Sequence, residues 1–152
     1  AAVGYGSTGQ AIFGYGYSTG NVSLTNLVNN SGVVAADVTG VGTARRALAA
    51  ASFGGDKAIF GYGNTGSSVS MTNLVSNTGV VAADVSGVGT ARIQLAATGY
   101  GGDKALFGFG INSSTYYSIT NLVNNSGVVA SDTTGVGTIR RSIAAAGYSS
   151  SA

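Results

Sequence analysis

Short runs of alternating apolar and polar residues recur along this chain, and they predict β-strands. In the middle third of the chain the pattern predicts four strands, at 57–62, 69–75, 80–85 and 90–97. In the last of these runs Ile93 and Leu95 face one side while Arg92 faces the other, which is the period of two expected of a half-buried strand. Turns rich in Asn, Ser, Thr and Gly separate the runs, and such residues favour tight hairpins.

The runs belong to a unit that occurs three times. Ala-Ile-Phe-Gly-Tyr-Gly begins at Ala11 and at Ala58, and it returns as Ala-Leu-Phe-Gly-Phe-Gly at Ala105. The two spacings are equal (58−11 and 105−58 both give 47), and a fixed period of this size is the signature of a repeat protein. We therefore predict a single repeat domain over residues 1–152, with units at about 4–50, 51–97 and 98–148.

Four strands in each unit of about 47 residues predict an all-β fold with almost no helix. A helix is the competing interpretation of 90–97, since Ala and Arg favour helices, but this segment is short and bounded by glycines. Units of this size match the blades of a β-propeller. A propeller ring needs about four to eight blades. Three blades therefore predict either that two chains complete one ring or that this chain is part of a longer array. A β-trefoil is the alternative, and an open β-solenoid or fibre is the third choice.

An acidic and a basic residue recur at one fixed offset in a chain whose charged residues amount to only 8%. The pairs are Asp37 and Arg45, Asp84 and Arg92, and Asp132 and Arg140 (45−37, 92−84 and 140−132 each give 8). Because a lone buried charge is costly, we interpret the pair as a structural staple, repeated once per unit, that ties a strand to the neighbouring loop. The other interpretation is that the three arginines ring a pocket and bind an anion.

Composition removes several classes of function. His, Cys and Glu are absent, so the common acid–base and nucleophile sets are missing and the sequence predicts no enzyme. No disulfide or thiolate metal site is available, and we predict neither a metal nor a cofactor. The seven basic residues form no cluster that would indicate nucleic-acid binding. The chain contains no apolar run of about 18 residues, so the sequence predicts no membrane insertion.

Two family resemblances follow from the repeat. The order and spacing of three segments resemble the kelch repeat, and the resemblance covers nearly the whole chain. These segments are Arg92 with the small-residue strand after it, the apolar run from Lys104 that ends in glycines, and the hairpin from Thr120. No Trp follows the hairpin, and an aromatic residue interrupts the glycine pair. The resemblance implies propeller blades. The runs beginning at Asp56 and Thr72 also resemble repeat arrays in structural and fibre proteins of marine tailed phages, which implies a virion-surface or adhesive role.

Two function classes remain. The first is a non-enzymatic structural or assembly component of a virion or extracellular fibre, which could also serve host attachment. Its predicted partner is another copy of the chain, in a homodimer or a head-to-tail oligomer. The alternative is a repeat lectin that binds surface glycans. Its candidate contacts are Tyr62, Asn64, Asn112, Tyr116 and Tyr117. Tyr62 lies in a Gly-aromatic-Gly run, whose aromatic residue is either part of the core or a platform for sugar rings. Both classes predict an extracellular or virion-surface location.

Overall fold

The computed structural model describes residues 1–148 as β-strands joined by turns and irregular segments, which confirms the all-β prediction. The strands are β1 (Ala2–Tyr5), β2 (Gln10–Tyr17), β3 (Asn21–Val28), β4 (Ala49–Phe53), β5 (Lys57–Asn64), β6 (Ser68–Val75), β7 (Ala96–Tyr100), β8 (Lys104–Gly108), β9 (Ile111–Asn112), β10 (Thr115–Tyr116) and β11 (Thr120–Val123). Within that range no helix has the length and apolar character needed to cross a membrane.

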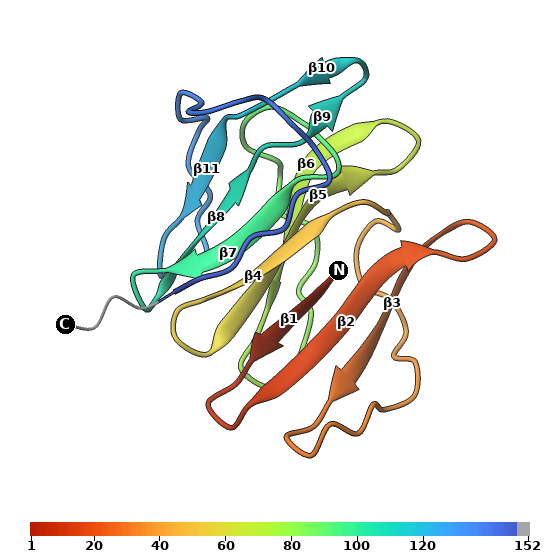
Figure 1. The fold of residues 1–152 in the computed structure, drawn as a ribbon. Coiled ribbons are helices and arrows are strands. Elements are labelled where there is room, and N and C mark those ends of the chain that lie inside the picture. Colours follow the sequence, from red (N-terminus) through yellow and green to blue (C-terminus); the bar gives the residue numbers. More distant parts are fainter. Residues whose placement is uncertain (149–152) are drawn as a thin grey trace.

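Three antiparallel sheets repeat one strand order (Figure 1). β2 lies between β1 and β3, β5 lies between β4 and β6, and β8 lies between β7 and β11. β9 and β10 form a separate hairpin in the third unit, where the repeat carries its extra residue. Among residues 1–148 the sheets remain separate, and none closes into a barrel.

Two of the four strands predicted for the middle unit are correct. β5 and β6 lie where 57–62 and 69–75 were predicted. The segment 80–85 lies beside β6 and is joined to it by isolated bridges at Val81 and Val85 and by backbone hydrogen bonds, but it forms no continuous ladder. The Asn73 side chain donates to the Ala82 carbonyl at 3.0 Å. The prediction of a strand over 90–97 is wrong up to Leu95. Gln94 has a φ of 54°, and this left-handed conformation interrupts an extended strand.

The apolar cores lie between the units. One core joins the first and second sheets through Tyr5, Ile12, Tyr15, Ala58, Phe60, Val75 and Val81. The other joins the second and third sheets through Ala49, Ala51, Phe53, Ile59, Tyr62, Leu95, Ala105, Phe107 and Val123. Each core is therefore shared by two neighbouring units, so the stability of a unit depends on the unit beside it.

Glycine lets two sheets approach closely at one recurring position. A Cβ atom on Gly14 would stand 2.7 Å from the Phe60 ring, and one on Gly61 would stand 2.5 Å from the Phe107 ring. Real Cβ atoms do not approach so closely, so each phenyl ring occupies the space that a side chain on the neighbouring sheet would need. The Gly of the apolar-Gly-aromatic-Gly run thus forms a slot for the Phe of the next unit.

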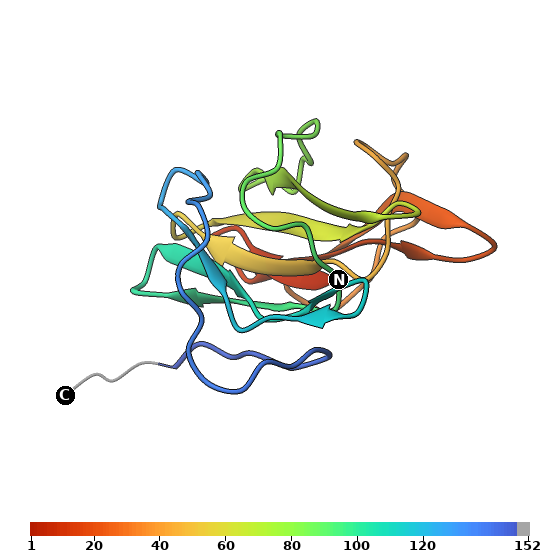
Figure 2. The ribbon, with the colours of Figure 1, turned by 90° about the horizontal axis from the view of Figure 1, so that it is seen from above.

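The last described residues lie outside the third sheet, as the dark blue segment in Figure 2 shows. Residues 144–148 read Ala-Ala-Ala-Gly-Tyr, which is nearly the sequence of β1 and of the residue before it. They lie beside β7, where a Cβ on Gly147 would be 2.8 Å from the Gly99 carbonyl oxygen. This segment is therefore placed against β7 much as β7 itself is placed against β4.

Candidate functional site

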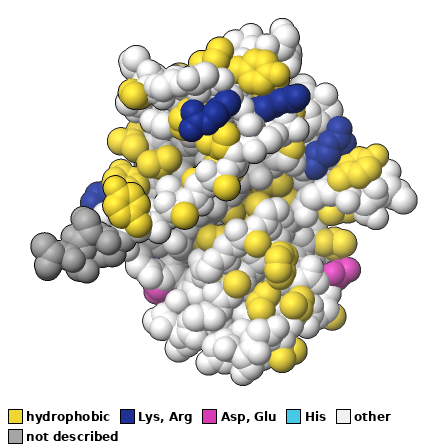
Figure 3. Space-filling model, in the orientation of Figure 1, with side chains coloured by type: hydrophobic (Ala, Val, Ile, Leu, Met, Phe, Trp, Pro, Cys, Tyr) yellow, Lys and Arg dark blue, Asp and Glu magenta, His cyan; other side chains and the backbone are white. Residues whose placement is uncertain are grey.

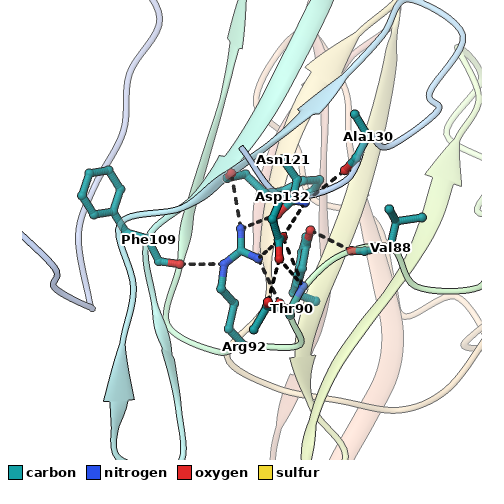
Figure 4. A network of polar contacts seen from close by, with 9 residues as sticks. Val88, Thr90, Arg92, Phe109, Asn121, Ala130 and Asp132 are labelled. Atoms are coloured by element: carbon teal, nitrogen blue, oxygen red, sulfur yellow. Dashed lines mark hydrogen bonds and ion pairs between the residues drawn. The ribbon is translucent and has the colours of Figure 1, made fainter. Parts of the chain in front are cut away.

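The recurring arginines lie between units. Arg45 and Arg92 are 0% exposed, and they are the largest fully buried side chains of a charge-poor chain. Each belongs to the irregular segment that leads from one sheet to the next, and its guanidinium group enters the following unit. Figure 4 shows this arrangement around Arg92.

The Arg92 guanidinium group donates hydrogen bonds in three directions (Figure 4). Its Nε donates to the Phe109 carbonyl at 2.8 Å, and its Nη2 donates to Asn121 Oδ1 at 2.7 Å. Its Nη1 donates to the Thr90 carbonyl at 3.0 Å. Arg45 makes the same three bonds, to Tyr62, Asn73 and Thr43, at 2.8, 2.7 and 3.1 Å. The planar, rigid fork of arginine suits such a set of acceptors, which the flexible ammonium group of lysine could not satisfy in the same way.

Asp132 completes the network from the receiving unit. It accepts hydrogen bonds from the Thr90 hydroxyl at 2.6 Å, from the Thr90 backbone N–H at 3.1 Å and from Asn121 Nδ2 at 2.9 Å. The direct ion pair is longer, with Arg92 Nη1 4.0 Å from Asp132 Oδ1. Asn121 and Thr90 therefore connect the two charges by hydrogen bonds, and the ion pair itself is the weaker link. We call this set of side chains the inter-unit staple.

The predicted pairing of the charges needs one correction. The Asp and Arg of a single stretch do not meet, because the acid that faces each arginine comes from the next unit. Arg45 lies 3.8 Å from Asp84, just as Arg92 lies 4.0 Å from Asp132. Asp37 accepts a hydrogen bond from Asn26 and has no arginine within ion-pair distance among the described residues. The equal offset of 8 therefore reflects the repeat period and not a local contact.

An aromatic ring packs against each of these guanidinium groups. The Arg45 guanidinium carbon lies 4.3 Å from the ring centre of Tyr15, and that of Arg92 lies 4.4 Å from the ring centre of Tyr62. Tyr62 has a φ of 65°, in the left-handed region that β-bulges use, and the ladder shifts register at this point. Its hydroxyl donates to the Val88 carbonyl at 3.2 Å. The aromatic residues of the Gly-aromatic-Gly runs thus belong to the staple.

Burial and hydrogen bonding set the electrostatics of the staple. Burial lowers the pKa of Arg45 and of Arg92, and it raises the pKa of Tyr62 to about 12 against the opposing charge of Arg92. Burial also acts to raise the pKa of Asp84, but hydrogen bonds from Thr43 and Asn73 outweigh it and hold that pKa below its usual value. At neutral pH the arginines are cations and Asp84 and Asp132 are anions.

The buried polar atoms of the staple are paired within the chain. Among the described residues, every buried side-chain nitrogen and oxygen has a hydrogen-bond partner. Arg45 and Arg92 are wholly buried, and each of their side-chain nitrogens already donates to an oxygen of the chain, which supports the staple interpretation over an anion pocket. A fully satisfied buried polar network of this kind fixes one orientation of neighbouring elements.

The predicted glycan contacts separate into buried and exposed residues. Tyr62 as a glycan contact is wrong, because its side chain is 0% exposed. Asn64 and Asn112 are half-buried, and Asn64 Oδ1 accepts a hydrogen bond from the Gly66 backbone. Tyr117 is half-buried, whereas Tyr116, in β10, is exposed.

Sequence reasoning missed two exposed pairs of arginine and tyrosine. Arg46 lies over the Tyr17 ring at 4.9 Å, and Arg141 lies over the Tyr116 ring at 5.6 Å. Figure 3 shows basic side chains gathered near the top of the face in view, beside hydrophobic ones. The signal in the sequence was that the staple arginine is followed by a second arginine in the first and third units, but not in the second, where Ile93 follows.

A hollow with a volume of about 540 Å³ lies along β4 and β7. Alanine, glycine and serine form most of its wall, in β4, in β7 and in the segment 145–148, and Lys104 is its one charged lining residue. Within residues 1–148, no three side chains of the metal-binding types His, Cys, Asp and Glu are grouped together. The hollow therefore offers shape and backbone polarity but little side-chain chemistry.

Comparison with known proteins shows a likeness in fold. No protein-family model and no curated protein sequence matches the chain. Among solved structures, it is similar to a fungal alcohol oxidase of the AA5 family in complex with copper, at a TM-score of 0.60 and 14% sequence identity. The likeness covers 85% of this chain and 29% of the oxidase chain, so this chain spans less than a third of that structure.

This comparison corrects the prediction that the chain is not an enzyme. A fold similar to 85% of the chain occurs within an oxidase, so a fold of this kind is compatible with a catalytic protein, and the exclusion drawn from composition is withdrawn. The likeness shows the fold alone and assigns no catalytic residue to this chain.

Proposed function

We propose that this chain is a structural or assembly component of a virion or extracellular fibre, built from kelch-like β-propeller blades. The observation that carries the proposal is the inter-unit staple, which repeats with the same partners and nearly the same distances at Arg45 and at Arg92. A unit that reproduces its own interface forms an extendable array. Its partner is then another copy of itself, as a homodimer or a head-to-tail oligomer.

The strand order supports the blade interpretation. Each three-stranded sheet is followed by a segment that bridges to its last strand, as Val81 and Val85 do to β6, in the position of a fourth strand. The inner strands β1, β4 and β7 lie next to one another in chain order. Propeller blades are four-stranded sheets arranged around an axis. Stacked sheets with cores only between successive units favour blades over the β-trefoil alternative.

The resemblance of the runs from Asp56 and Thr72 to phage fibre arrays supports the virion or extracellular setting. The test is immunogold electron microscopy with antibodies raised against the purified chain, applied to virions and extracellular material from the native source. Label on particles or fibres is expected. Label confined to the interior of cells would contradict the proposal.

A repeat lectin is the second candidate, and one observation favours it. Exposed tyrosines lie beside exposed arginines at Tyr17 and Arg46 and at Tyr116 and Arg141. Tyrosine rings stack on sugar faces, and an arginine beside them would pair with an acidic sugar. Such a surface would bind glycans and serve host attachment.

A glycan array separates the two candidates. If the lectin function holds, the chain binds a restricted set of acidic glycans and Tyr116→Ala reduces that signal at least about tenfold. Tyr100→Ala is the matched control, because Tyr100 is 38% exposed, Tyr116 is 39% exposed, and Tyr100 lies at the turn between β7 and β8. A blank array, or an equal loss in both variants, counts against the lectin.

A further inference from the structure

The outer face of the first unit carries the receiving half of a staple. Asn26 Nδ2 donates to Asp37 Oδ1 at 2.8 Å, and the two complete staples have the same bond at 2.9 Å. Asn26 also donates to the Ala35 carbonyl at 3.2 Å, as Asn73 does to Ala82. The receiving half is therefore arranged for an arginine that residues 1–148 do not supply.

An exposed phenyl ring, that of Phe13, also belongs to the first unit. Phe13 occupies the position that Phe60 and Phe107 hold in the other units. Phe60 and Phe107 are 0% exposed because each lies in the glycine slot of the preceding unit, whereas Phe13 is 50% exposed. The first unit thus presents a phenyl ring whose two counterparts are both buried in an inter-unit contact.

The outer face of the third unit carries the donating half. Arg140 lies over the Phe109 ring at 4.3 Å, the same distance as Arg45 over Tyr15. Its Nη1 donates to the Thr138 carbonyl at 3.0 Å, as Arg92 does to Thr90. Arg140 is nevertheless exposed, whereas Arg45 and Arg92 are wholly buried. The side chain already holds its staple conformation and lacks only the receiving unit.

The glycine slot on this face holds no ring from another unit, although Gly108 itself is buried. Gly108 corresponds to Gly14 and Gly61, which are filled by Phe60 and Phe107. A Cβ on Gly108 would meet only Thr120 and Leu106, at 3.2 and 3.7 Å, and both belong to the same unit. Where the first unit offers a ring, the third therefore offers the matching slot.

We infer that a second copy of this chain docks head to tail through these two faces, forming a third copy of the inter-unit staple. Arg140 of one copy donates to Asn26 and to the Tyr15 carbonyl of the next, and it faces Asp37. Phe13 of that next copy enters the slot at Gly108. Two observations identify the occupant: the charges of the faces are opposite, and each face continues an interface that the chain already makes twice. Such a contact is heterologous, so it extends or closes a ring by repetition.

The position beside β7 can hold only one strand. Residues 144–148 lie beside β7, where β1 of a docked copy would lie. β1 is held by its ladder with β2 and by the hydrogen bond that the Gly14 backbone N–H donates to the Ala1 carbonyl at 2.9 Å. Among the described residues no backbone hydrogen bond holds 144–148. This segment is therefore the one that yields when the second copy docks.

The experiment blocks one face at a time in the full chain. Arg140→Glu removes the donating half, and Phe13→Glu places a charge where the ring must enter the slot. Both changes introduce an acid, so the two blocked faces cannot attract each other. By light scattering after size exclusion, the unchanged chain is expected to exceed its mass of 14.8 kDa as concentration rises, and each variant alone is expected to stay at that mass. An equimolar mixture of the variants is expected to form a one-to-one dimer and nothing larger.

Lys57→Glu is the control, since it makes the same charge change at the turn between β4 and β5 of the middle unit, and it is expected to associate as the unchanged chain does. Thermal unfolding of each variant verifies folding. A chain that stays at single mass at every concentration, or a mixture that stays monomeric, overturns the inference. The inference rests on the assembly role proposed above, but the readouts differ: loss of immunogold label would remove that role and leave the solution mass unchanged.

Discussion

Tyr62 shows how a single residue serves two neighbouring contacts. Its carbonyl accepts a hydrogen bond from Arg45 of the preceding unit, while its ring lies under Arg92, the arginine that enters the following unit. The left-handed backbone at this bulge aims the two groups in different directions. Phe109 repeats the arrangement between Arg92 and Arg140. Successive staples are thus linked through one aromatic residue, which explains why an aromatic residue stands between two glycines in every unit.

At the residue scale, Arg92→Ala is expected to lower the free energy of unfolding by about 3–5 kcal/mol, because it leaves the buried Asn121 and a carboxylate without their cation. Arg140→Ala is the matched control. It removes the same side chain from the outer face, and at low protein concentration it is expected to change stability by no more than about 0.5 kcal/mol. Urea unfolding measures both, and equal losses would contradict the buried network as the source of the effect.

Tyr62→Phe is expected to cost only about 1 kcal/mol, the net contribution of a typical hydrogen bond, since it loses the bond to the Val88 carbonyl and keeps the ring under Arg92. Phe109 already fills the equivalent position in the third unit. Tyr62→Ala removes the ring and is expected to cost about 3–5 kcal/mol. Urea unfolding of the two variants checks this order, and a similar loss in both would show that the ring does not support the arginine.

At the scale of the elements, the sheets fit together through a ring on one and a glycine on the next. The central strands β2, β5 and β8 each carry Phe one residue before Gly, so the two point to opposite faces of the sheet. Each central strand thus offers a ring to the preceding unit and a slot to the following one. This arrangement fixes both the order of the sheets and their separation.

Gly61→Ala is expected to destabilise the chain by about 1–3 kcal/mol, because the added methyl group collides with the Phe107 ring between two packed sheets. Gly108→Ala introduces the same methyl group where no ring from another sheet is present, so a much smaller loss of stability is expected. The midpoints of urea unfolding, measured at low concentration, make the comparison. Equal losses would mean that backbone propensity, and not the sheet contact, requires the glycine.

At the scale of the whole molecule, stability depends on contacts between units. Both apolar cores and both complete staples join neighbouring sheets. The described part of the chain should therefore unfold as a cooperative array in which loss of one interface weakens the next.

The fall of the melting temperature at low pH tests this dependence on contacts between units. The pKa values of Asp84 and Asp132 are lower in the folded chain than in the unfolded one, so the unfolded state binds more protons in the acid range. Their contribution is present above the unfolded pKa of about 3.9 and is lost as pH falls through the folded value. The melting temperature should therefore fall below about pH 4.

The double variant Asp84→Asn and Asp132→Asn provides the check on that assignment. It should melt lower than the unchanged chain at pH 7 and show a shallower decline in acid. Asp56→Asn with Asp103→Asn is the control. Hydrogen bonds from Lys57 and Lys104 also lower the pKa of these two carboxyl groups, but both lysines are exposed, so this variant should lose a smaller share of the decline. An unchanged acid decline in the staple variant would assign it to other groups.

The sequence by itself determined the repeat, the all-β class, the central strands and the importance of Asp and Arg. These follow from local information, because alternation of apolar and polar residues and a fixed period can be seen without knowing what lies across an interface. It also indicated that the aromatic residues between glycines belong mostly to the core, as Tyr15 and Tyr62 do.

Only the tertiary structure decided which charges meet. An offset of 8 within a stretch and a contact with the next unit are indistinguishable in a periodic sequence, since every copy offers the same residues. It also decided that 90–95 is irregular, because the bonds that Arg92 makes belong to the neighbouring unit. The exposure of Phe13 and Arg140, in contrast with the burial of their counterparts, depends on the arrangement of three units in space, and local pattern carries no information about which face of an array remains open.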